Sequence, residues 1–263
     1  MLKKQKNLLF IAVVGSFLIS SCAEMKITTK IPFIKSESIK KIALTQVMIG
    51  VPQKKYFPLI DAGIFNSKMN KISDEIFDLQ SSKVNAYNES IAQKMKAKFG
   101  CEVLSGKELI ESPNFAKTKE NMNNAKAMLT EDDNYPIVNM ATGQFNAYSF
   151  AKGDVDHFIF ENAGYKSISI DLCKQLEVDA VVLSFTRFKI IDVKIFGSSA
   201  VSRLYTTFLI YYKDGRKIGE AEAYSKIHYV TGKDIIEYKM VFDDFETIIE
   251  PLTTQITKST DIN

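Results

Sequence analysis

Two alternating runs on either side of an Asp-Gly pair place the strongest constraint on the fold of this chain. Residues 200–212 and 217–229 flank Asp214 and Gly215, and an Asp-Gly pair between such runs is the strongest short-range sign of a β-hairpin. A two-residue turn of this type requires positive φ at both central residues. A third run, 178–190, is apolar on both faces at first and alternates later, as in a strand at the centre of a sheet. We therefore predict a central strand followed by an antiparallel hairpin.

Helical spacing separates these strands from an earlier one. The apolar, β-rich run 41–49 predicts a buried strand. Apolar residues recur at three- and four-residue spacing in 72–99, up to a helix-ending Gly100, and in 167–176, with Ser167 as the expected N-cap. A last helix is expected from about Asp243. The predicted fold class is α/β: a mixed sheet with helices packed on it, a C-terminal antiparallel hairpin and a terminal helix.

The middle of the chain is less regular. Ser105 and Glu108 have the spacing of a capping box and predict a short helix. From about 114 to 164, Asn and Gly residues are scattered among isolated aromatics, so we interpret this segment as an irregular insertion. Because loops on a rigid scaffold commonly carry function, we expect it to capture a partner. The candidate partner-binding residues are the aromatics of the insertion that are hardest to bury: Phe145, Tyr148, Phe150, Phe158 and Phe160.

The beginning of the chain is typical of a lipoprotein export signal. Lys3, Lys4 and Lys6 precede a short apolar run, 8–18, and two serines stand directly before Cys22. A charged segment, an apolar segment and small residues before a cleavage site describe a secretory signal. The apolar run is too short for a membrane-spanning helix, which needs roughly 20 residues. We predict that Cys22 becomes the acylated first residue of the mature protein.

This signal sets the domain boundaries and corrects the charge. We expect a signal peptide at 1–21, a tether at 22–38 and one α/β domain at 39–263 that contains the insertion. The chain has 34 basic and 31 acidic residues, and loss of the three signal lysines leaves 31 of each. The mature protein therefore lacks the basic excess of a nucleic-acid-binding protein. Its expected partners are a membrane, through the N-terminal lipid, and an envelope protein; Ala23 rather than Asp after the cysteine favours the outer membrane in a two-membrane bacterium.

Catalytic and metal-binding patterns are missing from the sequence. The two histidines, His157 and His228, lie far apart, and no zinc or phosphate-loop motif is present. Asp154 and Asp156 alternate as hard cation ligands do, but a third acidic ligand in register is lacking, which favours a solvated loop. His228 falls on the polar face of the run 217–229 and is expected to be exposed. We predict no catalytic residues, no metal site and no cofactor.

Two cysteines remain after processing. Cys101 lies beside a predicted strand and Cys173 on a predicted helix. In an oxidising compartment they can pair; the alternative, which we favour, is two buried thiols on the inner faces of their elements.

Three segments resemble a known group of proteins. They are Lys41-Ile42-Ala43-Leu44, Val103-Leu104-Ser105 with the trailing Ser112-Pro113, and Asp179-Ala180-Val181-Val182 before the long hairpin. Together with the lipobox they resemble envelope lipoproteins related to the curli-secretion channel protein and the TolB N-terminal domain. The resemblance covers residues 39–110 and 166–258 and implies a small α/β domain without catalytic residues. It does not cover 114–164, and the chain lacks a long amphipathic segment like the one that builds the secretion pore.

The leading functional hypothesis is a lipid-anchored, non-enzymatic envelope protein that docks on another envelope component and supports its assembly, stability or transport. An envelope hydrolase and a carrier of a small apolar ligand are the alternatives. The oligomeric state is left open by the sequence.

Overall fold

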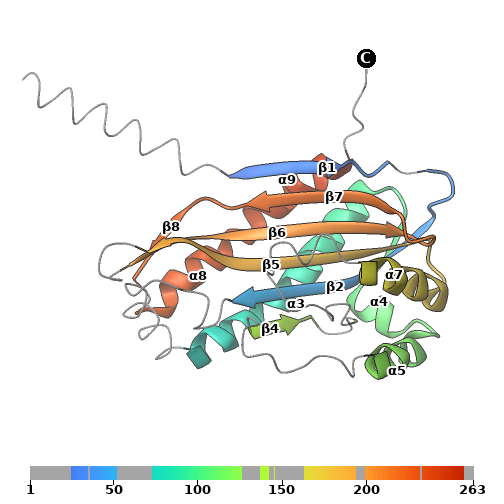
Figure 1. Ribbon diagram of the computed structural model, residues 1–263, viewed down its shortest axis with the longest axis horizontal. Helices are drawn as coiled ribbons and strands as arrows, with labels where there is room; N and C mark the ends of the chain where they lie inside the picture. Colours follow the sequence, from blue (N-terminus) through green and yellow to red (C-terminus); the bar gives the residue numbers. More distant parts are fainter. Residues whose placement is uncertain are drawn as a thin grey trace, which may run out of the picture.

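The protein is a mixed β-sheet covered by helices on both faces, which confirms the predicted fold class (Figure 1). The computed structural model describes residues 25–34, 36–51, 73–125, 137–141, 145, 163–193, 199–231 and 233–257. Its strands are β1 (Lys26–Ile31), β2 (Lys41–Val51), β3 (Glu102–Leu104), β4 (Ile137–Met140), β5 (Ala180–Val193), β6 (Ala200–Tyr212), β7 (Lys217–Tyr224) and β8 (His228–Val230). Its helices are α3 (Ser73–Lys98), α4 (Gly106–Ile110), α5 (Phe115–Ala125), α7 (Ala163–Leu176), α8 (Ile235–Asp243) and α9 (Phe245–Thr257).

The strand order is β1-β7-β6-β5-β2-β3, with β4 beside the end of β2 and β8 beside the start of β6. β5 lies between β6 and β2, so the run with apolar residues on both faces is central, as predicted. β2 runs parallel to β5, while β5, β6, β7 and β1 are antiparallel neighbours. The sheet is therefore mixed, with a parallel half crossed over by helices and an antiparallel half built by the hairpin.

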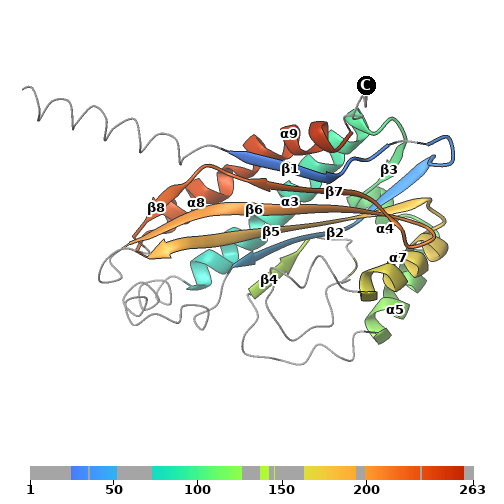
Figure 2. The ribbon, with the colours of Figure 1, turned by 45° about the horizontal axis from the view of Figure 1, so that its top comes forward.

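Alternation along the strands divides the core into two clusters. Ile42 and Leu44 of β2 point to the first face, which α3, α8 and α9 cover, whereas Ala43 points to the second face, where α4, α5 and α7 pack. Figure 2 shows α3 and α9 lying along the far side of the sheet. Because side chains alternate with a period of two, one continuous strand supplies both cores.

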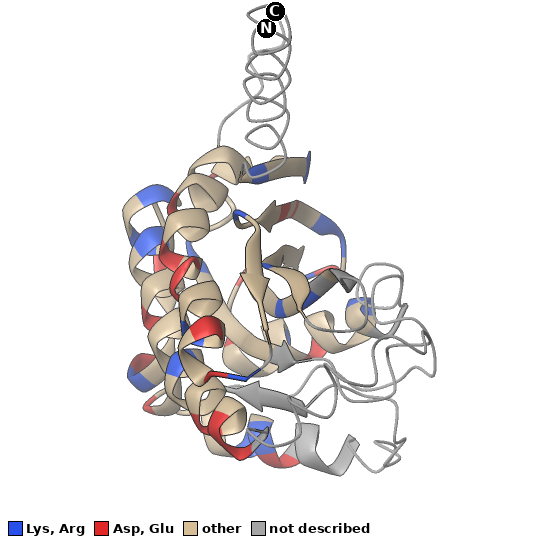
Figure 3. Ribbon diagram, turned by 90° about the vertical axis from the view of Figure 1, so that its left-hand side faces the viewer, with Lys and Arg blue, Asp and Glu red and all other residues tan. Residues whose placement is uncertain are grey.

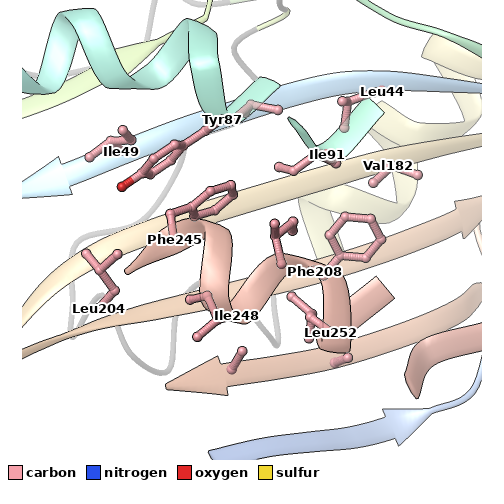
Figure 4. Packing of buried hydrophobic residues seen from close by; sticks show 14 of the residues in the cluster. Leu44, Ile49, Tyr87, Ile91, Val182, Leu204, Phe208, Phe245, Ile248 and Leu252 are labelled. Carbon is pink, nitrogen blue, oxygen red and sulfur yellow. The ribbon is translucent and has the colours of Figure 1, made fainter. Parts of the chain in front are cut away.

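The first face holds the larger hydrophobic cluster, and α3 and α9 pack against each other over it (Figure 4). The rings of Tyr87 and Phe245 stack with centroids 3.6 Å apart, and the Tyr87 hydroxyl donates a hydrogen bond to the Phe242 carbonyl. Burial, together with nearby carboxylates of α8 and α9, raises the pKa of Tyr87 well above its usual value. This tyrosine is a neutral structural donor.

The predicted tether is partly a strand. Residues 26–31 form β1, which pairs with β7, and Phe33 is buried in the first-face core. The Phe33 amide donates to the Ile256 carbonyl at the end of α9. The domain therefore begins near residue 26 and not at residue 39. The sequence signal for this strand was the alternation of Ile27, Thr29 and Ile31, and the surrounding lysines and threonines made it weak.

The hairpin is confirmed, but its turn differs from the prediction. Gly215 has φ of 81°, and Asp214 is not among the described residues with positive φ. The Gly215 amide donates to the Tyr212 carbonyl, and the Tyr212 amide donates to the Arg216 carbonyl. This is a three-residue loop with one left-handed glycine, the next most common hairpin connection.

Three helix ends also differ from expectation. Ser105 precedes α4 but makes no side-chain capping bond. α7 begins four residues before Ser167, so that residue lies inside the helix. The predicted last helix is α9, which begins at Phe245, and an additional helix, α8, precedes it and meets it at Asp244. Gly100 ends α3 with positive φ, as predicted.

The predicted insertion belongs largely to the body where it is described. α5 follows directly on Asn114, and β4 pairs with the end of β2. The ring of Phe145 is 1 % exposed and packs 5.2 Å from that of Phe115 in the second core. Phe145 is therefore not an exposed partner-binding residue. Its backbone amide donates a hydrogen bond to the Thr45 carbonyl of β2, which holds this part of the chain against the sheet. Tyr148, Phe150, Phe158 and Phe160 lie outside the described residues, as do Asp154, Asp156 and His157.

Candidate binding face

Beside its apolar cluster, the second face of the sheet carries a group of charged and aromatic side chains, several of which are buried. Strand register places Arg187 of β5 opposite Tyr205 of β6, Tyr205 opposite Tyr224 of β7, and Tyr224 opposite Lys26 of β1. Lys189 and Arg203 form the next row toward the end of the sheet. Since residues directly opposite on antiparallel strands have adjacent side chains, these positions form one continuous surface.

We define the cation–aromatic cluster as Arg187, Lys189, Arg203, Tyr205 and Tyr224. The Arg187 guanidinium lies 4.6 Å from the Tyr205 ring centroid, and that of Arg203 lies 4.2 Å from the Tyr224 centroid. The two tyrosine rings are 4.6 Å apart, and the Lys189 ammonium lies 5.7 Å from Tyr205. The three distances from a cation to a ring centroid are within the range of cation–π attraction.

Two glutamates border the cluster, and each forms an ion pair with a lysine. The Lys30 ammonium lies 2.5 Å from a carboxylate oxygen of Glu222, and the Lys217 ammonium lies 2.6 Å from one of Glu220. Burial lowers the pKa of Lys30, but the two carboxylates outweigh it and the net pKa is raised. Both glutamates are buried, although the alternation of this strand had suggested solvent exposure.

The remaining charge on this face is positive. Arg187, Lys189 and Arg203 follow each other on β5 and β6, and the Nε atom of Arg203 is buried with no hydrogen-bond partner among the described residues. Arg187 and Tyr205 are buried, whereas Lys189, Arg203 and Tyr224 are partly exposed. The partly exposed part of the cluster thus combines two cationic side chains with an aromatic ring.

Burial keeps Tyr205 and Cys173 in their neutral, protonated forms. Burial raises the pKa of Tyr205 above its usual value, so its hydroxyl stays protonated. Burial also raises the pKa of the Cys173 thiol to about 12, which removes the thiolate a nucleophile needs. Cys173 packs in the second core and Cys101 against the first, on opposite faces of the sheet, so the two cysteines do not pair.

His228 is not exposed as predicted. Its Nε2 atom lies 2.7 Å from a carboxylate oxygen of Asp244, and both side chains are nearly buried at the junction of α8 and α9. The alternation of β7 ends at Tyr224, and β8 starts a new register in which His228 lies opposite Ser202 on the first face. The nearby Ser225 hydroxyl donates to the Lys226 carbonyl and accepts from the Leu204 amide, so it is not placed as a nucleophile.

Within the described ranges, no group of three His, Cys, Asp or Glu side chains has the geometry of a metal site. None of the helices described there is long and apolar enough to cross a membrane.

No protein-family model and no curated protein matches this sequence. The resemblance to lipoproteins related to the curli-secretion channel protein and the TolB N-terminal domain therefore stays a prediction. What can be argued about function rests on the residues themselves.

Sequence reasoning did not single out the cation–aromatic cluster. Tyr205 is buried, and Arg187 comes to lie opposite it only through the register of β5 and β6. The available signal was the period of two: Arg187 and Lys189 on one strand, and Arg203 and Tyr205 on the next, mark a face that is not purely apolar.

Proposed function

We propose that this protein is a lipid-anchored, non-enzymatic component of the cell envelope that docks on another envelope component through its cation–aromatic cluster. In a two-membrane bacterium we place it in the outer membrane. Docking here means support of the partner's assembly, stability or transport.

The observation that carries the docking role is the arrangement of the two arginines. The guanidinium groups of Arg187 and Arg203 lie over tyrosine rings, while lysines hold the glutamates beside them. Arginine and tyrosine are the residues most enriched at binding hot spots. The partly exposed Lys189 and Arg203 favour a partner that presents carboxylate or phosphate groups.

The anchoring role is supported by the sequence before β1. Cys22 follows a signal-like segment with small residues before it, and only three residues separate it from Lys26. Several acyl chains on one cysteine make membrane attachment effectively permanent, whereas a single chain gives marginal binding.

Anchoring is tested with Cys22→Ser. We expect the wild-type protein to sediment with membranes and the variant to appear in the soluble fraction. Intact mass of the purified mature protein gives the acyl mass directly. A mature wild-type protein that retains residues 1–21, or that carries no acyl mass on Cys22, contradicts the proposal.

Docking is tested by placing a photo-crosslinking amino acid at position 189, inside the cluster, and at position 107 as a matched control. The Lys107 side chain is 86 % exposed on α4, away from the cluster. Irradiation of intact envelopes should give a discrete adduct from position 189 only, and Arg203→Glu should abolish it. The same adducts from both positions, or an adduct that survives Arg203→Glu, contradict docking through this face.

A further inference from the structure

Exposed apolar side chains gather at one end of the molecule. Eight large hydrophobic residues are exposed among the described residues, and six of them lie on elements at the end where the chain enters β1. We call this the α8 end. Its exposed apolar residues are Met25, Phe77, Ile191, Tyr229, Ile236 and Met240.

Strand register and packing place these residues together at one end. Met25 precedes Lys26, which pairs with the last residue of β7, and Ile191 lies near the end of β5. β8, with Tyr229, pairs with the first residues of β6, and α8 packs on β8 and β6. The first turns of α3 lie there too, because the Gln80 side chain donates to the Ile49 carbonyl near the end of β2. Figure 3 looks onto this end.

The three most exposed of these side chains lie close in sequence. Tyr229 is 67 % exposed, Ile236 59 % and Met240 55 %. Ile236 and Met240 are four residues apart on α8 and so share one side of the helix. The opposite side of α8 buries Tyr238, Val241 and Phe242 in the first core. α8 therefore carries apolar residues on its exposed side as well as on its buried side. A helix whose exposed side faces water normally carries polar residues there.

Charged side chains of both signs surround the exposed apolar residues of the α8 end. Lys26 and Lys233 are exposed there, as are Asp74, Glu75 and Asp78 in the first turns of α3. On α8 itself the acidic groups are engaged within the protein, since Asp234 accepts from the Ile236 amide at 2.9 Å and Glu237 accepts from the amide and hydroxyl of Thr231. Exposed lysines beside aliphatic and tyrosine side chains are the composition of surfaces that rest in the headgroup region of a bilayer.

The length of chain before β1 indicates which surface lies nearest. Four residue steps join Cys22 to Lys26, and an extended chain spans at most about 3.6 Å for each residue. An acylated Cys22 thus holds the start of β1 within about 14 Å of the membrane. We propose that the α8 end rests on the lipid bilayer, with Tyr229, Ile236 and Met240 in the interface; this rests on the proposed acylation of Cys22.

Because the chain contains no tryptophan, single substitutions provide the test. Ile236→Trp and Met240→Trp place a reporter at the α8 end, and Ile110→Trp places one on α4, where the native side chain is also exposed. The full-length mature lipoprotein is reconstituted into vesicles of phosphatidylethanolamine and phosphatidylglycerol whose acyl chains are brominated or not. Bromine quenches tryptophan only at contact with the acyl region.

We expect brominated lipid to quench Trp at positions 236 and 240 by roughly half and to leave position 110 unchanged, since an interfacial helix buries its apolar side about 5–10 Å deep. Vesicle flotation separates the two proposals. A protein that does not float overturns both acylation and bilayer contact. A protein that floats with unquenched Trp at positions 236 and 240, or with equal quenching at position 110, overturns the bilayer contact and leaves the anchor standing. Circular dichroism of each variant confirms that quenching is compared between folded proteins.

Discussion

The two faces of the sheet are built from different side chains. The first face holds the larger apolar cluster and is covered by three helices, two of which are joined by the stacked rings of Tyr87 and Phe245. The second face combines a smaller apolar cluster with arginines that lie over tyrosine rings. Apolar burial contributes most to stability, whereas paired and stacked charges contribute little net stability. We therefore expect the first face to contribute more to stability than the cation–aromatic cluster, which we propose as the docking surface.

The largest expected effect is on the first face. Phe245→Ala removes a fully buried ring and should lower the free energy of unfolding by about 3–5 kcal/mol. Urea unfolding followed by circular dichroism measures it. Phe77→Ala is the matched control, because that ring is 41 % exposed on α3. If both substitutions cost the same, the first face does not hold the fold in the way described.

The hairpin turn joins the sheet to α7 on the second face, and Gly215→Val should break that junction. Gly215 has φ of 81°, and an added Cβ would lie 2.6 Å from the Lys166 Cγ atom and 3.0 Å from the Ile170 Cδ1 atom. Backbone strain of this kind costs about 1–3 kcal/mol. Combining the substitution with Lys166→Ala should restore part of the loss by removing the clash. No change in the urea midpoint of Gly215→Val would contradict the turn.

Asp179 ties the two halves of the sheet together, and its contribution depends on pH. Its carboxylate accepts from the Lys40 and Lys41 amides at the start of β2 and pairs with Lys213 at 2.9 Å in the hairpin loop. Burial raises the pKa of Asp179, but these hydrogen bonds outweigh it and lower the pKa overall.

The sign of the pH dependence follows from this lowered pKa. The stabilisation is present above the ordinary aspartate pKa of about 3.9 and is lost as pH falls through the lower folded-state pKa. Asp179→Asn should therefore cost about 1 kcal/mol at neutral pH and progressively less below about pH 4. A difference that persists unchanged into acid would show that the carboxylate charge is not responsible.

The smallest expected effect on stability is in the cation–aromatic cluster. Arg203→Gln should cost about 1 kcal/mol, the usual size of a cation–π contact with a partly exposed cation, while it removes the crosslinked adduct from position 189. Arg216→Gln is a suitable control, since that side chain is 70 % exposed in the hairpin loop. A large loss of stability from Arg203→Gln would mean that the second face also holds the fold.

The parts of the fold that sequence could predict are those governed by local periodicity. The runs at 41–49 and 178–190, the hairpin and the end of α3 at Gly100 follow from alternation, helical spacing and turn chemistry. β1 was not predicted because an edge strand among lysines resembles a linker until its partner, β7, is known. The cation–aromatic cluster was not predicted for a related reason. Arg187, Tyr205 and Tyr224 come together only through the pairing register of three strands, which no single segment encodes.

The position of β1 ties the two ends of the folded domain together. Lys26 pairs with Tyr224, and the amide of Phe33 reaches the carbonyl of Ile256, more than two hundred residues later in the chain. The segment made first thus completes its contacts only after the last helix has been made. We therefore expect this edge of the sheet to be the last part of the domain to fold. Truncation within α9 would leave that edge open, and an open edge is a template for strand pairing between molecules.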